Sequence, residues 1–357
     1  MPVYYYKDLT PRVRVRRSFL LVKGDYTAIL RAENVQTILR RLEATPYRHY
    51  ISKILSEEFT PEKAEEALIQ AYYDDIRLIL TLLNNRKAID FFKEIHRSVE
   101  LETISAVLKS ILLSVVWEKA TRTIVPFGTL DQATAKGLIE SANLRKALQL
   151  LKESELVKRI EKVLQETEDL TTQALEIGAA IGRHTSETIW KKTKALDLQD
   201  LLVAKLVGIT FDTANIMLTL RMKKLGFKPT DIEQYLIPNA FKLSRDELRR
   251  SASAPSVKDA VKVFTGGYYV NVIAPSLGTF ETTNDLMIFE TALKRYHATE
   301  CDKAFIQIFT LGEGVAYMYL KWYEIHDLLS MLIGKHLGLS PEKIERHLVL
   351  HQVPHPM

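Results

Sequence analysis

The stretch LVKGDYTAILRAENVQTILRRLEATPYRHYI, which begins at Leu21, decides the fold because the chain repeats it twice. LDQATAKGLIESANLRKALQLLKESELVKRI begins at Leu130 and LSRDELRRSASAPSVKDAVKVFTGGYYVNVI begins at Leu243, and the three segments align without gaps. Apolar residues recur in them at steps of three to five, which is typical of helices. The shared apolar positions are Val35/Leu144/Val257, Leu39/Leu148/Val261, Leu42/Leu151/Phe264, Tyr47/Leu156/Tyr269 and Ile51/Ile160/Ile273.

One aligned polar position predicts where a helix begins in each copy. Asn34, Asn143 and Ser256 occupy it, and short polar side chains favour the N-terminal cap of a helix. Continuous helices are also expected over residues 64–83 and 144–164, from apolar periodicity. The run TGGYYVNVI (265–273) is the most β-like in the chain, and we interpret it as a loop that enters a helix.

A second repeat closes two of the units. NIMLTLRMKKLGFKPTDIEQYL begins at Asn215 and DLLSMLIGKHLGLSPEKIERHL begins at Asp327. A glycine in each, Gly226 or Gly338, is placed to end a helix, and a proline soon after it is placed to start the next one. Thr60-Pro61-Glu62 has the same pattern of a helix start.

The repeat period is about 110 residues, so each unit has the size of a domain rather than of a solenoid repeat. We therefore expect an all-α protein of three similar helical domains, 1–127, 128–240 and 241–357, with pseudo-threefold character. The scarcity of glycine (14) and proline (12) also favours helices over turn-rich β folds.

Composition excludes several classes of protein. Hydrophobic residues make up 46% and charged residues 26%, so the chain is not disordered as a whole. The net charge of +5 permits an anionic partner but does not require nucleic acid. One cysteine, Cys301, cannot build a disulfide framework. We expect neither a signal peptide nor a membrane-spanning segment.

No catalytic constellation or cofactor site is expected. Gly334-Lys335 is followed by His336 within a helical pattern, so it is not a phosphate-binding loop. Asp74-Asp75 resembles part of the aspartate cluster with which all-α prenyl-transferring enzymes hold magnesium–diphosphate, but the cluster is not completed. We interpret this pair as a solvated helix face.

The histidines near the C-terminus and the single cysteine are also interpreted as structural rather than as metal-binding or catalytic residues. His347, His351 and His355 recur at steps of four, but Pro354 interrupts the pattern, which favours an exposed tail without a metal. Cys301 follows His297 by one helical turn, and nothing orients the pair for catalysis, so a structural thiol is favoured.

The ordered set of motifs resembles the C subunit of the archaeal and bacterial A/V-type rotary ATPases, a relative of the d subunit of eukaryotic V-ATPases. The likeness covers nearly the whole chain, and it departs where His326-Asp327 follows Glu324 in place of the usual Arg-Asn. The residues that carry it are Tyr5-Tyr6, Asp25-Tyr26, Thr45-Pro46-Tyr47, Phe211-Asp212-Thr213-Ala214-Asn215-Ile216, Gly314-Val315-Ala316-Tyr317 and Gly338-Leu339-Ser340-Pro341-Glu342.

The resemblance implies a funnel-shaped, non-catalytic rotor part with a central cavity, on the cytoplasmic face of the membrane. It implies one copy per complex and contacts with the membrane rotor ring (c/K-type proteolipids) and the central stalk (D and F types), without cofactor or nucleic acid. Basic residues are the candidate partner contacts: Arg12 and Arg16 first, then Arg221, Lys223 and Lys335.

Three rival interpretations stay open. A free-standing helical scaffold with another partner is the main alternative. The other two are a prenyl-transfer enzyme and a nucleic-acid binder, whose affinity would fall steeply with salt. The basic run Arg12, Arg14, Arg16 and Arg17 fits either a partner contact or a solvated helix start.

Overall fold

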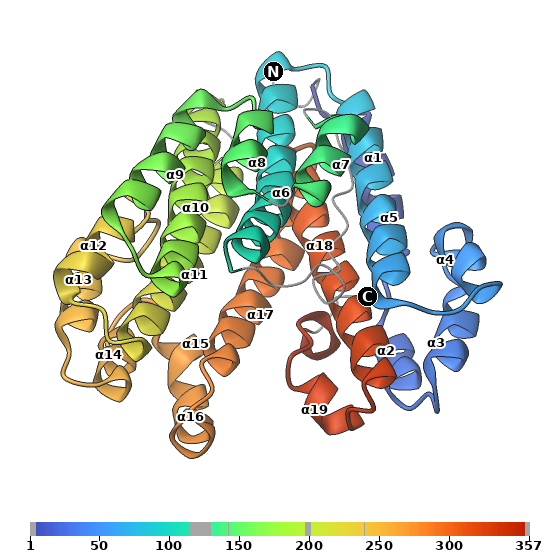
Figure 1. Ribbon diagram of the computed structural model, residues 1–357. Helices are drawn as coiled ribbons and strands as arrows, with labels where there is room; N and C mark the ends of the chain where they lie inside the picture. The colour runs from blue at the N-terminus through green and yellow to red at the C-terminus, as the bar shows by residue number, and fades with distance from the viewer. Residues whose placement is uncertain (1–4, 114–129, 142, 197–200, 239, 354–357) are drawn as a thin grey trace. The chain divides into compact units, whose positions relative to one another are not determined.

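The computed structural model describes residues 5–113, 130–141, 143–196, 201–238 and 240–353, and every element in these ranges is helical (Figure 1). The expected all-α class is confirmed. The expected domain boundary at 127/128 and His355 lie outside the described residues. The longer helices are α5 (Pro61–Thr81), α6 (Arg86–Leu112), α9 (Ser154–Glu166), α10 (Leu170–Ala195), α11 (Leu201–Lys224), α17 (Met287–Ala304) and α18 (Leu311–His336).

The remaining elements are short helices that lie between or after the long ones. They are α1 (Leu9–Arg17), α2 (Lys23–Leu30), α3 (Val35–Leu42), α4 (Arg48–Leu55), α7 (Gln132–Glu140), α8 (Leu144–Leu150), α12 (Pro229–Tyr235), α13 (Arg245–Ser253), α14 (Val257–Phe264), α15 (Val270–Ile273), η3 (Ala274–Ser276), α16 (Leu277–Thr283), α19 (Pro341–Glu345) and η4 (Leu350–Gln352).

The chain forms two compact units. The larger unit holds the described residues of Met1–Arg86, Leu196–Gln234 and Ala240–Met357, and the smaller one those of Lys87–Ala195 and Tyr235–Asn239. The larger unit thus joins segments from both ends of the sequence. The expected division into three domains, and the funnel they would form, remain predictions.

Each of the three aligned segments folds into three helices. We call them the first triad (α2–α4), the middle triad (α7–α9) and the third triad (α13–α15). The predicted caps Asn34, Asn143 and Ser256 each accept a backbone N–H bond at the start of the second helix. The accepted N–H groups belong to Thr37, Arg145 and Asp259, at 3.0, 2.8 and 3.1 Å.

The expected continuous helix over 144–164 is wrong, because α8 ends at Leu150 and α9 begins at Ser154. The backbone of Leu151 is extended there, with ψ of 124°. The chain carries neither glycine nor proline at this break. Breaks at the same place in the first and third triads show that the repeat, rather than local composition, sets the end of the helix.

Each triad packs against long helices of its own unit. In the larger unit, α3 packs on α18, and both α13 and α14 pack on α11. In the smaller unit, buried Leu138, Leu148 and Leu156 share a core with Leu101 and Ile104 of α6. The first triad therefore docks on a helix from the far end of the chain. Figure 1 shows α1 and α5 in blue beside the red α18, with which both are in contact.

The predicted helix ends are confirmed. Gly226 and Gly338 have φ of 83° and 69°, a left-handed conformation that glycine adopts without the penalty of a Cβ. The N–H after each glycine donates to the carbonyl five residues earlier, from Phe227 to Met222 and from Leu339 to Gly334, at 3.1 and 2.9 Å. Thr60 and Ser340 cap α5 and α19, which start with proline as expected.

One helix in the described part of the chain, α11, is long and apolar enough to cross a membrane. Its Asp212, Asn215 and Thr219 are fully buried within the larger unit, where α11 packs on α13, α14 and α17. These buried polar residues and the surrounding helices are typical of a core helix.

Candidate partner interface

Lys223 and Lys335, aligned by the repeat, make the same bond within the larger unit. Lys223 Nζ donates to the carbonyl of Ala252 at 2.9 Å, and Lys335 Nζ donates to the carbonyl of Leu30 at 3.4 Å. Leu30 ends α2, and Ala252 lies in the last turn of α13. A cation there satisfies carbonyls that have no partner inside the helix. Their role at a partner surface stays a prediction.

A buried carboxylate lies eleven residues before each of these lysines. Asp212 accepts a backbone bond from Leu243 N at 3.3 Å, and Glu324 accepts one from Leu21 N at 2.5 Å. Leu21 and Leu243 are themselves aligned positions at the start of the first and third triads. The same contact therefore fixes both triads to their long helices.

A tyrosine at the start of the third helix completes this contact in the first and third triads. Tyr47 Oη donates to Glu324 at 2.5 Å, and Tyr269 Oη donates to Asp212 at 2.7 Å. Burial raises the pKa of the Asp212 carboxyl, and it raises the pKa of the Tyr47 hydroxyl well above its ordinary value. These groups hold the fold together and do not face solvent.

Arg16 is engaged inside the chain rather than free. Its guanidinium lies 3.1 Å from the carboxylate of Asp75, which also accepts from Tyr317 at 2.6 Å and lies 3.9 Å from Lys321. The expected solvated face at Asp74-Asp75 is therefore right for Asp74 and wrong for Asp75, which is buried. Asp75 is buried because α5 turns it toward α18, which supplies its partners.

Arg221 also has partners of its own. It forms an ion pair with Glu290 of α17, and its guanidinium lies 3.9 Å from the sulfur of Met287. Lys294 binds the same glutamate at 2.8 Å. Arg221 is about half exposed, so a partner would meet a residue that is already paired.

Arg12 differs from the other four candidates. It is exposed on α1, and no hydrogen bond or ion pair joins it to any residue that the structure describes. Arg14, which we did not single out, binds Glu313 at 2.7 Å and the carbonyl of Phe305 at 2.6 Å. Arg14 lies two positions after Arg12 and therefore on the opposite side of α1. This position in the helix is the sequence signal that could have shown that Arg14 binds within the chain and Arg12 does not.

Large apolar side chains lie exposed around Arg12 and Arg14. Val15 and Phe19 lie three and seven positions after Arg12, and 54% and 53% of their surfaces are exposed. Ile306 and Ile308, 82% and 58% exposed, lie in the loop whose carbonyls Arg14 binds. We call Arg12, Val15 and Phe19 the α1 face. Exposed apolar residues next to a free cation are typical of a binding surface.

The histidines and the cysteine have structural roles in the part of the chain described. His297 Nδ1 lies 2.7 Å from the Tyr323 hydroxyl, and its Nε2 lies 3.8 Å from Cys301 Sγ. Burial lowers the pKa of His297 to about 4 and raises that of Cys301 well above its ordinary value, so both are neutral near pH 7. The expected exposed tail is right for His347 and wrong for His351, which is buried beside Tyr26.

No three His, Cys, Asp or Glu side chains converge as a metal site would require among the described residues. The arrangement is one of structural contacts and exposed surfaces.

The sequence was compared with known protein families. The model of a family described as ATP synthase (C/AC39) subunit matches residues 9–347. The chain belongs to this family. The resemblance to the C subunit of the A/V-type rotary ATPases is thereby confirmed.

Individual members of the family are distant in sequence but match along their length. The A-type ATP synthase C subunit of Methanocaldococcus jannaschii is 20% identical, with 96% of this chain and 86% of the relative covered. The C subunit of Archaeoglobus fulgidus is 22% identical, with 96% and 95% covered. That of Desulfurococcus sp. is 24% identical, with 94% and 88% covered. This C/AC39 chain is therefore a subunit of a rotary ATP synthase.

Proposed function

We propose that the chain is a non-catalytic adapter of the central rotor, which links the membrane rotor ring to the central stalk and transmits torque between them. The observation that carries this proposal is membership in the ATP synthase (C/AC39) subunit family over residues 9–347. One copy per complex, peripheral on the cytoplasmic face, is part of the proposal.

Buried contacts between the two ends of the chain, within the larger unit, support a role in torque transmission. The first triad is bonded to α18 through buried Glu324, Tyr47 and Lys321, and more than 270 positions of the sequence separate Tyr47 from the other two. Such contacts between the two ends of a chain resist separation of its parts, because a buried charge that loses its partner is costly. A body that transmits torque needs this resistance, since packed interiors transmit strain.

The α1 face supports a partner contact. Arg12 supplies a positive charge that no described residue neutralises, and the exposed apolar side chains of Val15 and Phe19 follow it along the chain. An acidic and partly apolar surface complements it, as either the ring (c/K-type) or the stalk (D and F types) could present. We propose that Arg12 and its apolar neighbours contact one of these partners.

The test is the purification of the chain with its partners from membranes. An affinity tag on this chain, placed in detergent-extracted membranes, should retain ring, stalk and nucleotide-binding subunits together, identified by mass spectrometry. Recovery of the chain alone, while the ATP synthase stays intact in the same extract, would favour a free-standing scaffold.

A further inference from the structure

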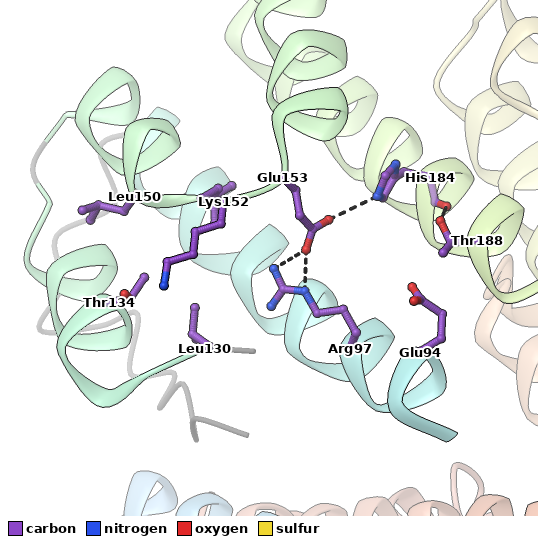
Figure 2. Close-up of a pocket in the computed structure, with 10 residues that line it drawn as sticks. Glu94, Arg97, Leu130, Thr134, Leu150, Lys152, Glu153, His184 and Thr188 are labelled. Atoms are coloured by element: carbon purple, nitrogen blue, oxygen red, sulfur yellow. Dashed lines mark hydrogen bonds and ion pairs between the residues drawn. The ribbon is translucent and has the colours of Figure 1, made fainter. Parts of the chain in front are cut away.

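The smaller unit contains a pocket of about 530 Å³ between the middle triad and helices α6 and α10 (Figure 2). Leu130, Leu150 and Leu151 give it an apolar wall. Figure 2 shows Leu130 and Leu150 on one side of the pocket and Glu94 and His184 on the other. A cavity that combines an apolar wall with a few polar groups is the usual form of a ligand site.

Most charges around the pocket are already neutralised within the unit. Arg97 binds the carboxylates of Glu100, at 2.8 Å, and of Glu153. His184 Nε2 lies 3.1 Å from the second oxygen of Glu153. Lys152 is mostly exposed and lies 3.8 Å from Asp131. The cations in the enclosed part of this pocket are therefore already paired, and an anionic ligand would have no free cation to bind there.

Glu94 is the exception. Its carboxylate is half-buried in the pocket wall, and no hydrogen bond or ion pair joins it to a residue that the structure describes. Burial raises the pKa of Glu94, and the charge of Glu153 adds to that rise, while Lys192, His184 and Arg97 oppose it. A carboxylate taken partly out of water without a directly bonded counter-ion gains most from a cation that enters beside it.

The first triad has a groove at the aligned place, and there the chain supplies its own cation. That groove, about 270 Å³ in volume, is lined by Leu21, Asp25 and Arg41. Leu21 is aligned with Leu130, and Arg41 with Leu150. The middle triad therefore carries leucine where the first triad carries arginine, and its pocket is the larger of the two.

We propose that this pocket binds a cationic group on an apolar stem, with Glu94 as its counter-ion and the leucine wall around the stem. A guanidinium or an ammonium group fits this chemistry. The lysine or arginine side chain of a partner subunit and a free alkyl amine are the two sources that supply it. The proposal goes beyond the adapter function and does not depend on it.

The first test uses n-butylguanidinium chloride as the probe and the isolated full chain as the receptor. Methyl NMR signals of Leu130, Leu150 and Leu151 should shift saturably, and n-butanol should bind about tenfold more weakly because it lacks the charge. Equal affinity for the two probes, or no saturable shift, would overturn the proposal.

A pair of variants tests the role of Glu94. Glu94→Gln should lose most of the preference for the cation, whereas Glu161→Gln, at an exposed position of α9, should keep it. Binding should also weaken as the pH falls through the pKa of Glu94, because the protonated acid is no counter-ion. If Glu94→Gln keeps the wild-type methyl NMR spectrum, and so its fold, yet still prefers n-butylguanidinium to n-butanol, Glu94 is not the counter-ion.

Carbodiimide labelling of Glu94, read by mass spectrometry, distinguishes the two sources. Protection in the purified complex but not in the isolated chain would identify a side chain of a partner. Equal labelling in both, with protection by n-butylguanidinium, would identify a free amine. Labelling that neither the complex nor the probe reduces would overturn the proposal.

Discussion

Tyr47 donates its phenolic hydroxyl to Glu324 at 2.5 Å, across 277 positions of the sequence. Its aligned counterpart, Tyr269, donates to Asp212 at 2.7 Å across 57 positions. Asp212 occupies the place on α11 that Glu324 occupies on α18. The repeat has therefore preserved the way a triad docks on a long helix, whether the two are near or far apart in sequence.

Removal of the Tyr47 hydroxyl should destabilise the larger unit. Tyr47→Phe leaves buried Glu324 without one of its donors, although Lys321 still binds it at 3.2 Å. We expect the free energy of unfolding to fall by about 1–3 kcal/mol, measured by denaturant titration. Tyr50→Phe is the matched control, because Tyr50 bonds the exposed Asp74 at 3.0 Å. Equal losses in the two variants would show that burial of the carboxylate is not the cause.

Substitution of the two glycines with left-handed backbone should destabilise the protein. Gly338→Val, or Gly226→Val, forces a β-branched residue into a positive φ, and we expect a loss of about 1 kcal/mol or more. No atom would crowd a Cβ at either place, so we attribute the expected loss to the positive φ. Gly24→Ala, in the first turn of α2 and equally uncrowded, should be neutral or stabilising. A Gly338→Val variant as stable as the wild type would contradict the assigned conformation.

Asp327 should make stability depend on pH. Burial raises its pKa to about 7, with Glu324 adding to the rise, while Arg295 and the N–H groups of Val349 and Leu350 oppose it. Tyr26, on α2, faces the same group. Because the folded state holds this proton more tightly than the unfolded state, its contribution to stability falls as the pH rises from about 4 to about 7.

The comparison that isolates this contribution is with Asp327→Asn, since the repeat already places Asn215 at the aligned position. The wild type should lose stability relative to the variant between about pH 5 and pH 7, by a few kcal/mol at most, in chemical unfolding at each pH. A difference that stays constant over this range would rule out titration of Asp327.

Charge reversal at Arg12 and at Arg16 should have different effects on stability and on assembly. Arg16→Glu places a negative charge beside Asp75, at 3.1 Å in the present pair, and should lower stability by about 1 kcal/mol or more. Arg12→Glu should leave the fold intact, as circular dichroism and thermal unfolding would show, yet weaken assembly with ring or stalk.

The control for assembly is Arg48→Glu, another exposed arginine without a described partner, away from the α1 face. Recovery of partner subunits from membranes should fall for Arg12→Glu only. Undiminished recovery with Arg12→Glu would remove the α1 face from the interface.

The sequence predicts the local structure of this protein well. Caps at Asn34, Asn143 and Ser256, and helix ends at Gly226 and Gly338, follow from residue chemistry within a few positions. These features recur in aligned copies, so each copy supports the interpretation of the others. The break after Leu150 was missed because periodicity continues across it, although the aligned triads break there too.

Long-range contacts were not predictable from one sequence. The repeat shows that Lys223 and Lys335 are equivalent, but equivalence does not reveal that each binds a carbonyl of a triad. Likewise, Arg16 and Asp75 are charged residues on separate helices, and only packing of α1 and α5 on α18 brings them together. Charge in the sequence therefore indicated candidates for a partner surface, while partners within the chain separate the other four candidates from Arg12.

The central claim is that this C/AC39 chain serves as an adapter held between ring and stalk. The most direct measurement is native purification through a tag on this chain, followed by mass spectrometry of the retained subunits. If the chain is this adapter, ring, stalk and nucleotide-binding subunits should be recovered together, with one copy of the chain per complex. Recovery of the chain alone, from an extract in which the ATP synthase remains intact, would contradict it.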